Sequence, residues 1–211
     1  MALGATPEHD TLEMSYDEAP LKLIPEWMES ESALDLYKTL AHEVNWQQPL
    51  ITVYGKQHRI PRLQSWQGND SQAMRYSQKR FIAEPFHPRL LPVLYSLNQI
   101  LQATDPSAKA FNTVLLNYYR NGDDGMGWHS DDEPELGQNP VIASISLGAA
   151  RAFDFRLRHD HTVKKRFILE SGSLLLMLRD TQGHWQHALP KSKRIKEGRI
   201  NLTFRYVKPS A

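Results

Sequence analysis

Residues 199–206 read Arg-Ile-Asn-Leu-Thr-Phe-Arg-Tyr, a strict alternation of polar and apolar side chains. A β-strand turns successive side chains to opposite faces, so one face carries Arg199, Asn201, Thr203 and Arg205, and the other carries Ile200, Leu202, Phe204 and Tyr206. Two guanidinium groups on a core strand need anionic partners, because a buried unpaired charge is costly. We therefore predict a core strand that borders a pocket for a small dicarboxylate.

Two short motifs predict a metal site. Trp128-His129-Ser130-Asp131 contains a histidine and a carboxylate two residues apart, and Trp185-Gln186-His187 adds a second imidazole. Two imidazoles and one carboxylate occupy one face of an octahedral metal and leave the opposite face open, which non-haem Fe(II) needs in order to bind a co-substrate and O2. An isolated H-x-D pair is also typical of a surface turn. Together with the arginine strand, however, His129, Asp131 and His187 predict the ligand set of an oxygenase.

Helices are predicted before residue 105 and strands after it. Ser30 is a candidate N-cap of a helix that ends near Trp46, and a second helix begins near Pro88. Residues 50–54 favour a strand, which Gly55-Lys56 would turn into a hairpin whose partner strand carries Ile60 to Gln64. Six later strands are predicted at 111–119, 141–147, 152–157, 162–169, 174–178 and 199–207. This order predicts an α+β protein with a β-sandwich or barrel-like core.

Length and composition narrow the classes of protein. The 211 residues fit a single domain at 21–211 after an acidic leader at 1–20, which we expect to be disordered. A net charge of +1 excludes a polycationic protein, so any contact with nucleic acid must come from local basic clusters. The absence of cysteine excludes disulfides and cysteine-ligated metals. Without a long apolar run or a signal-peptide pattern, we expect no membrane partner and a cytoplasmic location.

The motifs together resemble a known family. His129 to Glu133 (HSDDE), Trp185 to Pro190 (WxHxLP), Arg199 to Arg205 (RxNLTFR) and Asn117 to Tyr119 (NYY) are similar to motifs of the AlkB family, the Fe(II)- and 2-oxoglutarate-dependent oxygenases that remove alkyl lesions from nucleic-acid bases. Tyr54-Gly55-Lys56 and Ile60 to Gln64 resemble the substrate-probing hairpin of the animal double-strand and single-strand DNA demethylase homologues. The resemblance implies a double-stranded β-helix, or jelly roll, at 111–207 with N-terminal helices and a nucleotide-recognition lid at 50–80.

The resemblance also implies a co-substrate pocket. Asn117 and Tyr119 are two residues apart and therefore share one face of a strand, although a face turned to water would explain this pair equally well. By resemblance, Arg199 and Tyr119 hold the distal carboxylate of 2-oxoglutarate, Asn117 and Arg205 lie nearer the metal, and Asn201 completes the pocket. The implied requirements are Fe(II), 2-oxoglutarate and O2. We also expect Asp131 to accept a hydrogen bond from an arginine, because metal-bound carboxylates are usually oriented by a second donor.

Candidates for substrate binding follow from the need to hold a flipped base between aromatic faces and to read its edge. Trp66, Tyr76 and His129 are the aromatic candidates, and Glu133 could read the edge of the lesion; the resemblance adds Asp132. Trp66 and Tyr76 are equally typical of ordinary core aromatics. Tyr54 could fill the gap that a flipped base leaves, with Arg62 reaching phosphate or the opposite strand, although a plain cross-strand pair also explains Tyr54.

Two basic clusters favour phosphate contacts over simple solvation, since both would flank the site. They consist of Arg156, Arg158, Lys164, Lys165 and Arg166, and of Lys191, Lys193, Arg194 and Lys196. The expected enzyme is a monomer that demethylates 1-methyladenine or 3-methylcytosine in single- or double-stranded DNA. It would couple 2-oxoglutarate decarboxylation to alkyl hydroxylation and formaldehyde release. The alternatives are the same chemistry on methylated RNA or on a protein side chain, and a non-catalytic jelly roll that binds lesions.

Overall fold

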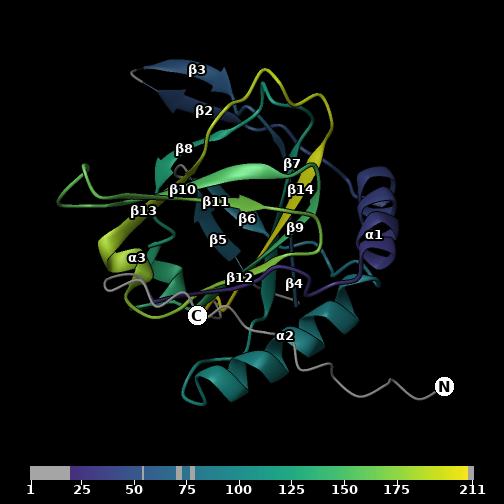
Figure 1. Cartoon of the computed structure of the whole chain (residues 1–211), viewed down its shortest axis with the longest axis vertical. Helices are drawn as coiled ribbons and strands as arrows, with labels where there is room; N and C mark the ends of the chain where they lie inside the picture. Colours follow the sequence, from purple (N-terminus) through teal and green to yellow (C-terminus); the bar gives the residue numbers. More distant parts are fainter. Residues whose placement is uncertain (1–19, 54, 70–72, 77–78, 209–211) are drawn as a thin grey trace.

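Two antiparallel sheets form the body of the protein (Figure 1). The computed structural model describes residues 20–208, except for 54, 70–72 and 77–78 and for the side chains of 53, 73–76 and 79–82. The major sheet has the order β1-β12-β9-β14-β7-β4, and the minor sheet has the order β11-β10-β13-β8. Their bounds are β1 Leu21–Ile24, β4 Leu63–Gly68, β7 Thr113–Tyr119, β8 Met126–His129, β9 Ile142–Gly148, β10 Arg151–Leu157, β11 Lys164–Leu169, β12 Leu174–Met177, β13 Trp185–Leu189 and β14 Arg199–Arg205.

Helices and two hairpins surround these sheets. The helices are α1 Ser30–Glu43, α2 Leu90–Thr104, the short α3 Thr181–His184 and a 3-10 turn at Pro134–Leu136. The hairpins are β2 Leu50–Val53 with β3 Lys56–Arg59, and β5 Ala73–Tyr76 with β6 Lys79–Ile82. Among the described residues, no helix is long and apolar enough to span a membrane.

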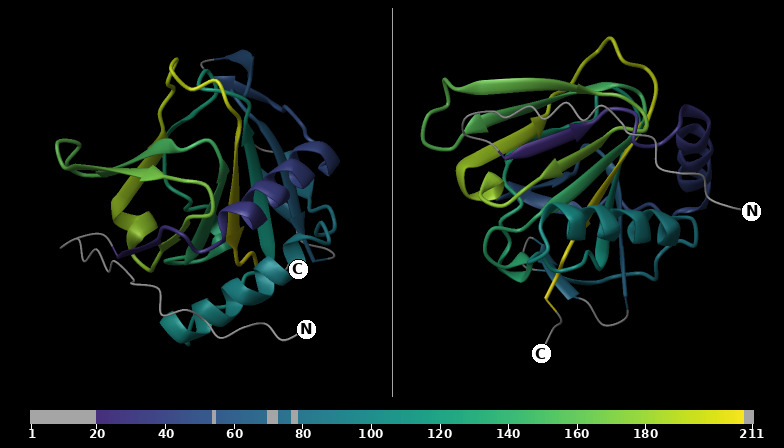
Figure 2. Two further views of the ribbon diagram at one scale, coloured as in Figure 1. Left: turned by 45° about the vertical axis from the view of Figure 1, so that its right-hand side comes forward. Right: turned by 60° about the horizontal axis from the view of Figure 1, so that its bottom comes forward.

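Strand alternation divides the apolar residues into two cores. Leu36 and Leu40 of α1 and Leu97 of α2 pack with Ile200 and Leu202 of β14, so both long helices cover the outer face of the major sheet (Figure 2). A second core fills the space between the sheets and contains Phe153, Phe155, Phe167 and Trp185 of the minor sheet with Ile142, Leu175 and Met177 of the major sheet. This leaves the polar face of β14 turned toward the minor sheet.

The structure has the two facing antiparallel sheets that a jelly roll predicts, and it contains the six predicted strands with small changes of boundary. Five further strands, β1, β5, β6, β8 and β13, were absent from the prediction. The predicted hairpin partner was wrong: Lys56–Arg59 pairs with β2, whereas Leu63 and Gln64 pair with β7 in the major sheet. Ile60, Pro61 and Arg62 separate the two strands, and Ile60 is fully buried.

Two details near the N-terminus also differ. The first helix ends at Glu43 rather than near Trp46, whose indole Nε1 donates to the carbonyl of Leu40, and Glu29 rather than Ser30 occupies the N-cap position. Of the predicted leader at 1–20, residues 1–19 lie outside the described residues, and the carbonyl of Pro20 accepts from the backbone N–H of Leu178.

Candidate active site

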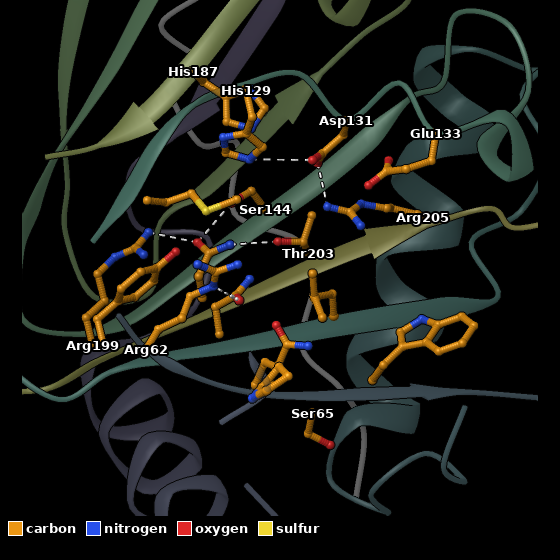
Figure 3. A pocket seen from close by; sticks show the side chains of 18 of the residues that line it. Arg62, Ser65, His129, Asp131, Glu133, Ser144, His187, Arg199, Thr203 and Arg205 are labelled. Atoms are coloured by element: carbon orange, nitrogen blue, oxygen red, sulfur yellow. Dashed lines mark hydrogen bonds and ion pairs between the residues drawn. The ribbon is translucent and has the colours of Figure 1, made fainter. Parts of the chain in front are cut away.

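A cavity of about 460 Å3 lies between the two sheets (Figure 3). One wall is the polar face of β14 together with the side chains of Asn117 and Tyr119 from β7. Register explains this grouping, because Arg199 is paired with Tyr119 and Asn201 with Asn117 on the neighbouring strand. The opposite wall includes His129 at the end of β8 and His187 on β13. The alternation seen in the sequence therefore builds one polar cavity.

His129, Asp131 and His187 come together at this cavity. Each offers one ligand atom, and these atoms lie within 4.8 Å of one another. His129 Nε2 lies 3.6 Å from Asp131 Oδ1, while His129 Nδ1 lies 2.9 Å from the carbonyl of Gly127, a contact that orients the ring. His187 is paired with His129 across β8 and β13, and its buried Nδ1 has no hydrogen-bond partner in the part of the chain that the structure describes. Two imidazoles and a carboxylate at this spacing could hold Fe(II).

The electrostatics of the cluster suit a cation. Burial lowers the pKa of His187 to about 3, so its imidazole is neutral at physiological pH. Burial opposes ionisation of Asp131, but the charge of Arg205, the two neighbouring histidines and the hydrogen bond from Arg205 together outweigh it, and the pKa of Asp131 is lowered to about 2. Metal ions bind neutral imidazole and ionised carboxylate, so these two residues are already in the binding form.

Arg205 orients Asp131. Its guanidinium donates from Nη2 to Asp131 Oδ2 at 2.6 Å, and both side chains are buried. This confirms the prediction that an arginine donates to Asp131, and it leaves Oδ1 facing His129. Arg205 Nε is also buried and has no partner among the described side chains and backbone, so the same guanidinium retains one donor for a ligand.

Arg199 is the clearest indication of an anionic ligand. It is 1% exposed, and its Nη2 donates to Ser146 Oγ and to Asn201 Oδ1, both at 2.8 Å, while its Nε has no partner within the described residues. Burial lowers the pKa of Arg199 to about 10, so the group is still charged at neutral pH. Among the described residues no carboxylate lies within ion-pair distance of it. A buried cation with only neutral partners is expected to bind an anion.

Asn117 and Tyr119 line the same cavity. Tyr119 is buried, which raises the pKa of its phenol, and the guanidinium carbon of Arg199 lies 5.7 Å from its ring centre. Asn117 Oδ1 accepts a hydrogen bond of 2.8 Å from Arg62 Nε. Both side chains could therefore contact a carboxylate that Arg199 binds, whereas the position of Asn117 relative to the metal stays a prediction.

Arg62 and Asp132 differ from their predicted placements. Arg62 is 4% exposed and points into the cavity, so it does not reach toward phosphate or an opposite strand. The reason is that residues 63 and 64 pair with β7 rather than with β2, so Ile60 and Arg62 lie buried in the connection between β3 and β4. Asp132 does not line the cavity; it is exposed and pairs with Arg158 Nη1 at 2.9 Å, because the residue after Asp131 turns to the opposite side.

Trp66 and Glu133 do line the cavity. Trp66 is half-buried and packs against Leu136 and Val207. Burial raises the pKa of Glu133, and its Oε2 has no hydrogen-bond partner among the residues that the structure describes. Tyr54 lies outside the described residues, as does the side chain of Tyr76 on β5. Their predicted contacts with a base stay predictions.

Ser144, which lines the cavity, and Ser146 and Gln182, which contact cavity residues, were not predicted from the sequence. Ser144 Oγ donates to Asn201 Oδ1 at 3.1 Å, and Ser146 accepts from Arg199. The alternation Ile142-Ala143-Ser144-Ile145-Ser146 in β9 was the available signal, since small polar residues two apart share one face. Gln182 accepts from the backbone of Asp131, a contact that no local pattern indicates.

The two basic clusters lie on exposed segments. Lys191, Lys193, Arg194 and Lys196 are exposed in the loop between β13 and β14. Hydrogen bonds link this loop to the β7–β8 turn at Gly122, where an added Cβ would lie 1.7 Å from the Ser192 carbonyl oxygen. In the other cluster Arg156 lies over the ring of Trp128, and Arg166 pairs with Asp154. Only part of the positive charge of this cluster is therefore available to a ligand.

Comparison with known proteins agrees with this geometry. Residues 20–205 match the family model described as the 2OG-Fe(II) oxygenase superfamily. "Alpha-ketoglutarate-dependent dioxygenase alkB homolog 3" of Bos taurus is 40% identical over 196 residues, which cover 89% of this chain and 66% of that protein. "DNA oxidative demethylase ALKBH2" of Mus musculus is 36% identical over 167 residues, which cover 76% of this chain and 67% of that protein. The chain thus spans about two thirds of the length of these curated relatives.

Solved structures share the fold. A Pseudomonas putida prolyl-4-hydroxylase aligns with a TM-score of 0.62 and 14% identity, over 92% of this chain and 95% of that chain. The structure of OsALKBH1 aligns with a TM-score of 0.61 and 17% identity, over 90% of this chain and all of that chain. The predicted jelly-roll fold is therefore confirmed.

Proposed function

This chain belongs to the 2OG-Fe(II) oxygenase superfamily and, within it, to the AlkB family of dioxygenases, and we propose that it is an oxidative demethylase of N-alkylated bases in DNA. The observation that carries the proposal is a single cavity that contains both a His-Asp-His cluster and a buried arginine without a carboxylate partner among the described residues. These are a cation site and an anion site side by side, as Fe(II) and 2-oxoglutarate require.

His129, Asp131 and His187 would hold Fe(II). The bound metal, with 2-oxoglutarate and O2, supplies the oxidising power that hydroxylates the alkyl group, with succinate, CO2 and formaldehyde as products. The protein contributes orientation and a dry cavity. Arg199 would pair with the distal carboxylate of 2-oxoglutarate, beside Tyr119 and Asn201. Arg205 would hold Asp131 and offer its free Nε, and Asn117 would complete the polar wall.

The target base would enter beside Trp66 and Glu133. Trp66 presents a half-buried indole to the cavity, and a flipped base is typically held against such a π-face. The free Oε2 of Glu133 provides a polar atom within the same cavity. Bases such as 1-methyladenine and 3-methylcytosine carry positive charge, which favours a carboxyl group over an amide at this position. The predicted contact of Tyr76 with the base is part of the same proposal.

One consideration favours DNA over RNA as the substrate: the Mus musculus relative that is 36% identical to this chain is a DNA oxidative demethylase. The exposed lysines of the β13–β14 loop would contact phosphate, which positions a strand without reading its sequence. Selection against RNA requires a contact or a clash at the 2′-hydroxyl.

A demethylation assay tests the proposal. Matched single-stranded DNA, duplex DNA and RNA, each carrying one 3-methylcytosine, are incubated with Fe(II) and 2-oxoglutarate, and formaldehyde and CO2 are measured. We expect both products from DNA and none from His187→Ala. CO2 without formaldehyde from any oligonucleotide would contradict nucleic-acid demethylation and favour a protein side chain, whereas binding without CO2 would favour a lesion-binding protein. Formaldehyde from RNA alone would overturn the choice of DNA.

A further inference from the structure

Gln182 links the two segments that carry the candidate metal ligands. It lies on α3, directly before β13 and His187, and is 1% exposed. Its Oε1 accepts a hydrogen bond of 2.9 Å from the backbone N–H of Asp131, and its Nε2 lies 3.5 Å from Met177 Sδ. The buried amide is therefore used to fix the backbone of one ligand from the segment that leads to another.

Two neighbouring residues, Arg158 and Ser130, reinforce this link. Arg158 Nη1 donates to Asp132 Oδ2 at 2.9 Å and to the carbonyl of Gln182 at 3.2 Å. Ser130 Oγ donates to the carbonyl of Trp185 at 2.8 Å. Residues 130, 131 and 132 are thus each hydrogen-bonded to Arg158 or to the segment 182–185; we call this set of contacts the loop clamp.

The loop clamp complements what Arg205 does. Arg205 fixes the carboxylate of Asp131 from the cavity side through Oδ2, whereas Gln182 fixes the main chain from which that carboxylate projects. With both ends held, Oδ1 is directed toward His129 Nε2. The chain also adopts a left-handed conformation at Asp180, with φ of +71°, to begin the short helix that presents Gln182. Such strained positions occur where the surrounding structure requires them.

We propose that Gln182 is a positioning residue for the metal centre, which acts through the backbone of Asp131 and is supported by Arg158. The proposal rests on the proposed function, since it requires a metal at His129, Asp131 and His187. Groups that orient metal ligands without touching the metal change metal affinity when they are replaced, typically by 10- to 100-fold. A side chain that only stabilises the fold would instead change the melting temperature and leave the affinity of the folded protein unchanged.

The test is a Co(II) titration of the metal-free protein, followed by calorimetry and by the visible spectrum of the bound ion. Gln182→Met removes the acceptor with little change of side-chain length. Gln186→Met is the matched control, because Gln186 lies one residue before His187 and its Oε1 accepts from Arg156 away from the cavity. We expect Gln182→Met to weaken Co(II) binding about ten-fold and to alter the spectrum. Gln186→Met should match the wild type in both measurements.

Arg158→Ala keeps the proposal testable if Gln182→Met fails to fold. Arg158 is exposed, so its replacement leaves the core intact, and we expect a loss of roughly three-fold in Co(II) affinity, smaller than the effect of replacing Gln182 because Arg158 does not contact Asp131 itself. Unchanged affinity and spectrum in a folded Gln182→Met protein, or in Arg158→Ala if the former does not fold, would overturn the proposal. Absence of Co(II) binding by the wild type would instead contradict the proposed function itself.

Discussion

Individual side chains determine the chemistry of the cavity through their partners. Arg199 and Arg205 share one face of β14, yet Arg205 has a carboxylate partner in Asp131, whereas Arg199 has only Ser146 and Asn201 among the described residues. Arg205 is therefore part of the candidate cation site, and Arg199 is the candidate anion site. Predictions about single residues follow from this difference.

Replacing any one of His129, Asp131 or His187 with alanine should abolish turnover, because two ligands rarely hold Fe(II) in a defined site. Product formation from a methylated oligonucleotide measures this. His184→Ala is the control: His184 is exposed three residues before His187 and should tolerate the change. Wild-type activity in any of the three ligand variants would refute the assignment of the metal site.

Arg199→Ala should impair use of 2-oxoglutarate far more than oligonucleotide binding. Leaving the distal carboxylate unpaired is expected to cost on the order of 2 to 5 kcal/mol, or roughly 30-fold or more in apparent affinity. The Michaelis constant for 2-oxoglutarate measures this, and the dissociation constant for an oligonucleotide is the comparison. Arg199→Lys should restore only part of the loss, because lysine lacks the bidentate guanidinium. An unchanged Michaelis constant in Arg199→Ala would locate the anion site elsewhere.

At the scale of elements, the β2–β3 hairpin is separate from the two main sheets (Figure 1). All four residues of β3 are exposed, and Gly55 turns the hairpin with φ of +77°. After β3 the chain passes through buried Ile60 and Arg62 into β4, which borders the cavity. The hairpin is thus an exposed extension attached to the wall of the candidate site, where it could contact nucleic acid.

Tyr54→Ala at the hairpin turn should reduce repair of a duplex lesion much more than repair of the same lesion in a single strand. A flipped base leaves a gap in a duplex stack, whereas a single strand has no such gap to fill. Paired demethylation rates on the two substrates test this prediction, which rests on the sequence. Lys193→Ala is the contrast: it should weaken binding to both the duplex and the single strand and flatten the salt dependence of binding, as expected of a phosphate contact. Equal loss on both substrates in Tyr54→Ala would indicate a structural role for the tyrosine.

At the scale of the whole molecule, the core between the sheets holds the cavity wall that contains His129 and His187 against the wall that contains Arg199 and Tyr119. Phe155 is fully buried in the minor sheet, and its ring lies 5.8 Å from those of both Phe167 and His187. Phe153, which lies on β10 with Phe155, also packs against His187, with 5.3 Å between the ring centres. The stability of the fold and the position of a metal ligand therefore depend on the same aromatic cluster.

Phe155→Ala should lower the free energy of unfolding by about 3 to 5 kcal/mol, because it leaves a cavity in a close-packed core. Urea denaturation of the metal-free protein measures the change. Ile168→Ala is the control, since Ile168 lies on the adjacent strand β11 and is 58% exposed. Similar losses in the two variants would contradict the assignment of this core.

The sequence by itself determined the polar face of β14, the His-x-Asp and His motifs and the strands that carry most of the core. Alternation is a local property of an extended backbone and survives whatever the strand later pairs with. Only the tertiary structure decided that Arg62 is buried beside Asn117, that Asp132 faces Arg158 and that Gln182 holds the Asp131 backbone. Those contacts join residues 26 to 55 positions apart. They depend on which strands become neighbours and in which register, and a shift of one residue turns every side chain of a strand to its other face.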